Sequence, residues 1–228
     1  MSSTVLSTKI LSPAQKSLLL NAGLRLVEYN AIITEPIPFE VPRQHFDLLV
    51  FTSKNGVLAF SDRLEHNDVS NDSIRNTKIA CCVGEKTKAL LEKKGYQVVL
   101  MSPNAEQLAK SLIKDYGPQR LLLIVGSQRR DELPDALQKS KMDFTEIIAY
   151  TTKANPKKME GTFDGILFFS PSGVESFCSA NTLSGLSFCI GTTTAKTLKK
   201  YTNNYIIANK PTIENVLVQS IKQLANRY

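Results

Sequence analysis

Short apolar runs alternate with amphipathic stretches along this chain. The runs lie at Asp47–Phe51, Lys78–Val83, Gln97–Leu100 and Arg120–Val125. An unbroken apolar run of this length is typical of a strand buried on both faces of a parallel sheet. The stretch 105–112 between two of the runs has apolar residues at i, i+3, i+4 and i+7, which predicts a helix. The alternation predicts an α/β fold with a doubly wound parallel sheet, flavodoxin-like or Rossmann-like.

The chain also repeats itself. Residues 47–60 read like residues 164–177, at an offset of 117. Residues 83–91 match 190–198, and the amphipathic stretch 105–113 matches 213–221 in the same order. Three matched segments in one order indicate two copies of one structural unit. We therefore expect two similar α/β lobes.

The start of the chain carries a piece that one copy lacks. Ser12-Pro13 is a helix start, and Ala14–Ala22 would be a helix that Gly23 ends. A strand is expected at Lys9–Leu11, so residues 9–32 would form a strand–helix–strand unit like the one at 120–152. The second strand of each unit carries a tyrosine, Tyr29 in the first and Tyr150 in the second. The economical arrangement is an interleaved pair, with domain one at 1–34 and 153–228 and domain two at 35–152. Prolines 36, 38, 42 and 156 mark the two crossovers.

Composition places the chain among ordinary globular proteins. It has 228 residues, of which 42% are hydrophobic and 21% charged. No apolar run approaches the roughly 20 residues of a membrane span, and the first residues lack the pattern of a signal peptide. The four cysteines form no C-x-x-C pair, which favours buried reduced thiols and a cytoplasmic location.

The charge balance is basic and allows three interpretations. There are 28 Lys and Arg against 21 Asp and Glu, a net charge of +7, and the pI is near 9.2. The cations are spread along the chain, which suits a small polyanion in a cleft, although solubility alone would also explain them. Nucleic-acid binding is a third reading, but the chain has no aromatic RNA-binding pattern and no basic helix.

Four repeated turns carry small hydroxyl residues and glycine. They span residues 51–56, 84–87, 169–173 and 191–194, each between an expected strand and an expected helix. Backbone N–H groups and the helix dipole at such turns make anion sites at the carboxyl ends of the strands. The alternative is that the hydroxyls only cap their helices. With four such turns expected to face one another across two domains, anion binding is the favoured interpretation.

Other chemistries find little support. There is neither a G-x-x-x-x-G-K-[ST] motif nor a G-x-G-x-x-G motif, so nucleotide binding is poorly supported. His45 and His66 are the only histidines, which excludes a histidine-rich metal site and makes a Ser–His–Asp triad unsupported. Tyr150, at the second crossover, is then the best proton donor, since a phenol can protonate a leaving hydroxyl. A packing tyrosine is the equally open alternative.

Taken together, the motifs resemble those of the uroporphyrinogen-III synthase family. The resemblance covers about residues 46–224 and, more weakly, the first 40. The family converts linear hydroxymethylbilane to cyclic uroporphyrinogen III with inversion of ring D and loss of water, in haem and sirohaem biosynthesis, without cofactor or metal. The resemblance also implies two lobes joined by a two-stranded connection. The motifs that carry it are Phe51–Val57, Val83–Thr87, Ile148–Thr152, Phe168–Val174, Ile190–Ala195 and Pro211–Glu214.

By this resemblance, Tyr150 matches the tyrosine proposed to assist departure of the hydroxyl. The substrate-contacting turns would supply Thr52, Ser53, Gly84, Thr87, Ser172, Gly173, Gly191, Thr193 and Thr194. Two departures from the family pattern stand out. The family often has an arginine just after the first strand, whereas here the expected strand Lys9–Leu11 runs into Ser12-Pro13. Family members often have proline where Thr192 stands.

The expected partner is a small polycarboxylate substrate, with neither nucleic acid nor membrane. A monomer is expected, with a transient contact to the preceding enzyme of the pathway, and the two lobes should hinge. The alternative function is a non-catalytic two-lobed binding module for a small polyanion. Such a module would use the same turns but would not need Tyr150.

Overall fold

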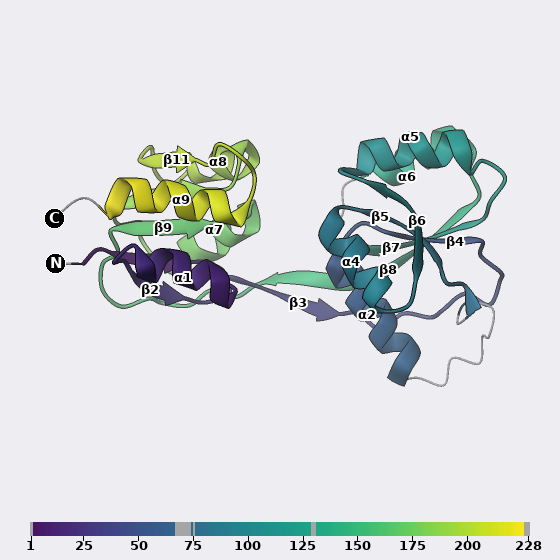
Figure 1. Cartoon of the computed structure of the whole chain (residues 1–228), viewed down its shortest axis with the longest axis horizontal. Coiled ribbons are helices and arrows are strands. Elements are labelled where there is room, and N and C mark those ends of the chain that lie inside the picture. Colours follow the sequence, from purple (N-terminus) through teal and green to yellow (C-terminus); the bar gives the residue numbers. More distant parts are fainter. Residues whose placement is uncertain (1, 67–73, 75, 129–130, 226–228) are drawn as a thin grey trace. The chain divides into compact units, whose positions relative to one another are not determined.

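The computed structural model describes residues 2–66, 74, 76–128 and 131–225. Its contacts divide the chain into two units. Lobe one comprises Met1–Ile33 and Lys153–Tyr228, and lobe two comprises Thr34–Thr152. The sequence placed these boundaries after residues 34 and 152. Each lobe contains one sheet with helices on both faces (Figure 1).

Lobe two is built on a six-stranded sheet in the order β3-β8-β7-β4-β5-β6. The pairings that join β8, β7, β4, β5 and β6 are parallel. The strands are β3 (Ile32–Pro36), β4 (Leu48–Phe51), β5 (Ile79–Val83), β6 (Gln97–Ser102), β7 (Leu121–Gly126) and β8 (Phe144–Ala154). The helices that carry the argument are α2 (Lys54–His66), α4 (Glu85–Lys93), α5 (Ala105–Asp115) and α6 (Glu132–Lys139).

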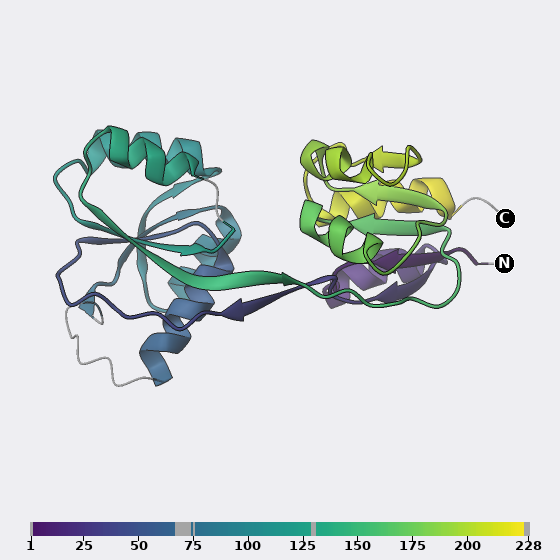
Figure 2. The same ribbon diagram turned by 180° about the vertical axis from the view of Figure 1, so that it is seen from behind.

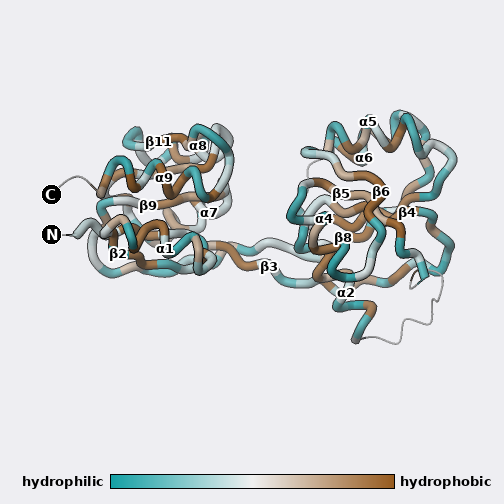
Figure 3. Tube along the Cα trace, in the orientation of Figure 1, coloured by the Kyte–Doolittle hydropathy of each residue, from teal (hydrophilic) through white to brown (hydrophobic). Residues whose placement is uncertain are grey.

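Both faces of this sheet are buried. Along β4, Leu49 packs in a cluster with Phe60 of α2, and the neighbouring Leu48 packs on the other side with Leu108 of α5. Strand side chains point alternately to the two faces, so a strand covered on both sides must be apolar throughout. Figure 3 shows this hydrophobic centre beneath mixed helices. The doubly wound α/β fold predicted from the sequence is confirmed.

Lobe one repeats the same plan with five strands in the order β11-β10-β9-β1-β2, all paired in parallel. Helices α7 and α8 pack on one face, and α1 and α9 pack on the other. The elements are β1 (Thr4–Ser7), α1 (Pro13–Asn21), β2 (Arg25–Glu28), β9 (Gly165–Phe168), α7 (Pro171–Cys178), β10 (Leu186–Cys189), α8 (Thr192–Leu198), β11 (Tyr205–Ile207) and α9 (Ile213–Leu224).

The two sheet orders correspond strand by strand. Reading β11-β10-β9-β1-β2 against β6-β5-β4-β7-β8 places the N-terminal unit β1–α1–β2 where lobe two has β7–α6–β8. The duplicated, interleaved arrangement is therefore confirmed. The expected strand at Lys9–Leu11 is wrong, because the first strand is β1, at Thr4–Ser7. The N–H groups of Ile10 and Leu11 bond side chains of β2 and the following loop instead of a neighbouring strand.

The chain passes between the lobes twice, along β3 and β8. These strands are neighbours at one edge of the lobe-two sheet, where they run side by side (Figure 2). The N–H of Ile37, just beyond β3, donates to the carbonyl of Ala149 at 3.0 Å. A two-stranded connection thus joins the lobes, and Tyr150 lies within its second strand, β8. None of the described helices is long and apolar enough to cross a membrane.

Candidate functional site

Tyr150 lies within β8, opposite Gly126, the last residue of β7. The register between these strands shifts here, so that Val125 pairs with Ile148 and Gly126 with Tyr150. The N–H of Ser127 donates to the carbonyl of Tyr150 at 2.9 Å, which fixes its backbone. Its hydroxyl is 2.7 Å from the Ser53 hydroxyl, at the start of α2. The structure therefore brings two of the predicted residues, 97 positions apart, into one hydrogen bond.

The half-buried Tyr150 side chain lines two pockets of lobe two, each of about 360 Å³. One pocket lies at the carboxyl ends of the strands, where ligands of doubly wound sheets bind. It also contains Thr52 and Ser53, and Glu132 is the one charged side chain among its described lining residues. The second pocket lies between β3 and α2 and is lined by Asn55, Asp62, Glu65 and Lys94 among others. The Tyr150 side chain is thus available to a molecule bound in either pocket.

Two of the four repeated turns are capped by their own serine. Ser53 Oγ accepts the N–H of Gly56 at 3.2 Å, and Ser170 Oγ accepts the N–H of Gly173 at 3.1 Å. These serines correspond at the repeat offset of 117. Helix capping, the alternative reading of these turns, is therefore present at both. Ser172 was the serine predicted from the sequence for this turn, but Ser170 is the capping residue, and the two hydroxyls are 3.3 Å apart.

The other two turns leave their helix starts without a side-chain cap. Gly84 precedes α4 and Gly191 precedes α8, and neither can supply a capping oxygen. The first N–H groups of a helix have no partner inside the helix, so they are available to water or to an anion. Gly84 has φ of 82°, a conformation that favours glycine. Thr193, in the first turn of α8, is exposed.

The threonines at the ends of these two turns are buried. Thr87 is 5% exposed and its repeat equivalent Thr194 is 2% exposed. The N–H of Thr87 donates to the carbonyl of Gly84 at 3.0 Å, within the turn. A molecule in the adjoining space would reach only a small part of either side chain. Both residues therefore help to pack the start of a helix on its sheet.

The equivalent tyrosine of lobe one has a different setting. Tyr29 follows β2 as Tyr150 lies in β8, but it is only 7% exposed and its hydroxyl has no hydrogen-bond partner among the described residues. Burial, with a smaller contribution from Cys178, raises the pKa of Tyr29 to about 12. A phenol held in this way is a packing side chain. In lobe two, by contrast, Tyr150 lines the two pockets described above.

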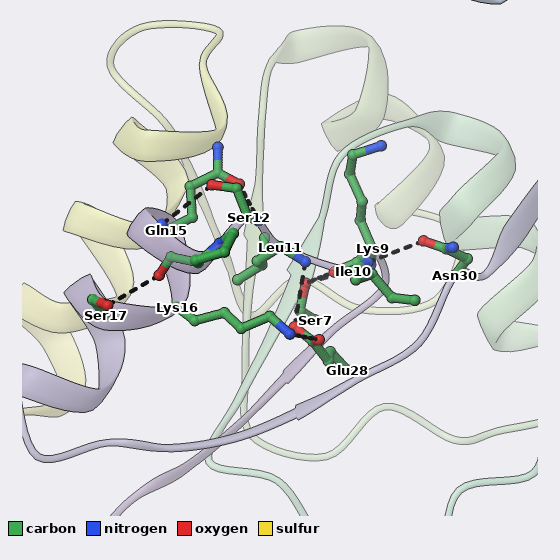
Figure 4. A network of polar contacts seen from close by, with 11 residues as sticks. Ser7, Lys9, Ile10, Leu11, Ser12, Gln15, Lys16, Ser17, Glu28 and Asn30 are labelled. Atoms are coloured by element: carbon green, nitrogen blue, oxygen red, sulfur yellow. Dashed lines mark hydrogen bonds and ion pairs between the residues drawn. The ribbon is translucent and has the colours of Figure 1, made fainter.

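Lobe one holds a cation at the corresponding edge of its sheet. Lys9 lies two residues beyond β1, with its backbone held by bonds to the hydroxyl of Ser7. The ion pair between Lys16 and Glu28 and the Ser12 cap fix the rest of this loop (Figure 4). The Lys9 side chain extends away from that network. Because β1 ends at Ser7, the residues that follow the first strand are Thr8 and Lys9. The chain thus has a lysine here, and the departure from the family's arginine remains.

Other candidate groups stay apart from this site. Among the described residues, no three His, Cys, Asp or Glu side chains form a group that could hold a metal ion. His45 is exposed and lies 3.2 Å from Asp47, before β4. The four cysteines are free thiols.

Comparison with known proteins gives one consistent result. The family model "Uroporphyrinogen-III synthase HemD" matches residues 14–217. The porphyrin biosynthesis protein HemD of Ruminiclostridium josui is 28% identical over 221 residues, covering 86% of this chain but only 43% of that protein, so the chain spans less than half of its length.

Two solved structures share the fold. Uroporphyrinogen-III synthetase of Helicobacter pylori superposes with a TM-score of 0.77 at 18% identity, covering 98% of this chain and all of the other. A mutant uroporphyrinogen III synthase of the extremely thermophilic bacterium Thermus thermophilus gives 0.62 at 17% identity, covering both chains completely.

Proposed function

This chain belongs to the uroporphyrinogen-III synthase family, and from that premise we propose that it cyclises hydroxymethylbilane to uroporphyrinogen III. The reaction removes one water molecule and inverts ring D. It would serve tetrapyrrole biosynthesis, which agrees with the match to a porphyrin biosynthesis protein. The proposal includes no cofactor.

One observation carries the chemical part of the proposal. Tyr150 and Ser53 both line a pocket at the carboxyl ends of the lobe-two strands, and their hydroxyls are 2.7 Å apart. In the first step the Tyr150 proton passes to the hydroxymethyl oxygen of the substrate and the C–O bond breaks. Water departs, and a stabilised azafulvene cation remains. The α-carbon of the last pyrrole ring that already carries a methylene bridge bonds to this cation, which gives a spiro intermediate. The bond from that α-carbon to the old bridge then breaks and leaves a second azafulvene cation, to which the free α-carbon of the inverted ring bonds. A proton released as the pyrroles regain aromaticity returns to Tyr150, so that only water is lost.

The substrate is a small polyanion, and the turns of both lobes supply groups suited to its carboxylates. Backbone N–H groups at uncapped helix starts bind anions without a cationic side chain. The net charge of +7 favours the approach of such a substrate. The proposed contacts are Thr52, Ser53, Gly84, Thr87, Ser172, Gly173, Gly191, Thr193 and Thr194. Of these, Thr87 and Thr194 are buried, so only a small part of either side chain would meet the substrate.

Positioning accounts for most of the remaining catalysis. A linear tetrapyrrole can close without inversion, so the protein must hold the reacting carbons in the geometry that leads to the inverted product. A sparse set of polar groups around a shaped pocket is sufficient for this task. We further propose a cytoplasmic monomer that meets the preceding enzyme of the pathway transiently.

A non-catalytic polyanion-binding module is the second candidate. It would use the same turns as the synthase but would not need the Tyr150 hydroxyl. Such a module would bind the linear substrate but would leave it to close without inversion.

The test supplies the purified chain with hydroxymethylbilane generated enzymatically, and then separates the oxidised porphyrins by isomer. We expect type III uroporphyrin in many-fold molar excess over the protein. Type I alone, at the rate of the protein-free control, would reject the synthase and leave the binding module.

A further inference from the structure

We propose that Gly126 and Ser53 are positioning residues for Tyr150, and that they hold its hydroxyl so that its proton faces the pocket. The expected effect on the reaction rate rests on the proposed function. The structural part stands on the geometry of lobe two. In this role, neither Gly126 nor Ser53 contacts the reacting atoms.

Gly126 provides the space in which the Tyr150 ring lies. A Cβ atom at position 126 would be 2.5 Å from Tyr150 Cζ, 2.6 Å from Cε2 and 2.9 Å from the hydroxyl oxygen. Contacts under 3.0 Å do not occur at real Cβ atoms, so any other residue here would displace the ring. The backbone has little freedom to move, because β7 and β8 are paired up to this point and Ser127 bonds the Tyr150 carbonyl. The side chain must therefore give way.

Ser53 fixes the hydroxyl end of the same ring. Its Oγ accepts the N–H of Gly56, which anchors it to the first turn of α2. That turn sits tightly on β7, since a Cβ at Gly56 would be 3.1 Å from the Ile124 carbonyl oxygen. With one lone pair of Oγ occupied, the Ser53 proton is available for the Tyr150 oxygen. A tyrosine that accepts this hydrogen bond keeps its own proton for a group in the pocket.

Lobe two thus makes room for the Tyr150 ring by having glycine at position 126 of β7. It holds the Tyr150 hydroxyl with Ser53, which caps α2. A misplacement of about 1 Å of a reacting group can cost on the order of 100-fold in rate. We therefore expect Gly126→Ala to lower kcat about 100-fold while KM changes less than about threefold, because the turns that bind carboxylates are untouched.

The matched control is Gly117→Ala. An added Cβ there would lie 3.8 Å from the nearest atom outside its chain neighbours, an ordinary contact, and Gly117 follows α5 away from Tyr150. This variant should keep the wild-type kcat and KM. The decisive comparison repeats Gly126→Ala in a Tyr150→Ala background, where no ring is left to displace. Gly126→Ala should then have no further effect on kcat.

A spectroscopic readout separates this inference from the proposed function. The chain has seven tyrosines and no tryptophan, so its near-UV circular dichroism is dominated by tyrosine. The difference between wild type and Tyr150→Phe gives the band of Tyr150. We expect Gly126→Ala to alter that band and Gly117→Ala to preserve it, whether or not the wild type makes uroporphyrinogen III.

Ser53 variants keep the test falsifiable if Gly126→Ala fails to fold. Ser53→Ala should lower kcat about tenfold or more, and Ser53→Thr should restore it, because threonine returns a hydroxyl at the same atom. An equal loss for the alanine and threonine variants would overturn the role of Ser53. Two results would overturn the role of Gly126. One is a Gly126→Ala variant with wild-type kcat and an unchanged Tyr150 band. The other is a Gly126→Ala change that lowers kcat by the same factor in the Tyr150→Ala background as in the wild type.

Discussion

Replacing Tyr150 by phenylalanine removes one proton and one hydrogen bond from the site. The ring keeps its place over Gly126, because the same carbon atoms contact that glycine. The lost bond to Ser53 is part-buried and is worth about 0.5–1.5 kcal/mol of folding free energy. For a chain of this length the melting temperature should fall by only a few degrees, at about 2–4 °C per kcal/mol. The variant should therefore be folded under assay conditions.

The kinetic effect should be much larger than the effect on stability. A positioned proton donor contributes about 10²- to 10⁴-fold, so kcat for type III formation should fall by at least about 100-fold with little change in KM. The assay follows hydroxymethylbilane consumption and separates the porphyrin isomers at each time. A variant that folds normally and keeps kcat within about twofold of wild type would refute proton donation by Tyr150. It would not by itself refute the synthase, since positioning could then supply the rate.

Further predictions concern folding and ionisation. Gly185→Ala should lose more than about 2 kcal/mol in urea unfolding, because its φ is +68° and a Cβ would lie 2.3 Å from a backbone oxygen. Gly23→Ala, with φ of +76° and open space around the added Cβ, should lose only about 1–2 kcal/mol. Equal losses for the two variants would show that the Cβ at residue 185 does not overlap the backbone. Burial raises the pKa of Tyr29 and of Cys81 to about 12, from 10.0 and 9.0. The folded state thus keeps protons that the unfolded chain releases at high pH. These two groups should leave the urea midpoint unchanged below about pH 9 and lower it between about pH 9 and 12. A constant midpoint between about pH 9 and 12 would contradict the raised pKa values. The buried Cys81, Cys82 and Cys189 should react with iodoacetamide at pH 8 only after denaturation, and rapid labelling of these three in the folded chain would contradict their burial.

Much of the fold could be predicted because it depends on local pattern. Strands β4, β5 and β7 are apolar throughout, since both faces of the sheet are covered, and such runs stand out in a sequence. Strand β1 was missed because Thr4–Ser7 contains only two apolar residues between polar ones. Its burial comes from its place in the middle of the sheet, between β9 and β2, and that is a tertiary property.

The site was predictable only in part. The turns were found because strand, glycine and helix follow each other along the chain, and Tyr150 because it ends a repeated unit. The sequence could not show that Thr87 and Thr194 are buried, since this depends on how each helix packs on its sheet. The fit of Gly126 against Tyr150 was equally hidden. It joins residues 24 positions apart through a local shift of strand register.

The central claim is that amide-rich turns at the carboxyl edges of both sheets bind a polyanionic tetrapyrrole. The most direct measurement is a titration of the ¹⁵N-labelled chain with uroporphyrinogen III, kept reduced, followed by amide chemical shifts. The account predicts that the largest changes fall on the turns 51–56, 84–87, 169–173 and 191–194 and on Tyr150. Changes centred instead on the opposite edge of the lobe-two sheet, around His45 and Lys78, would contradict it.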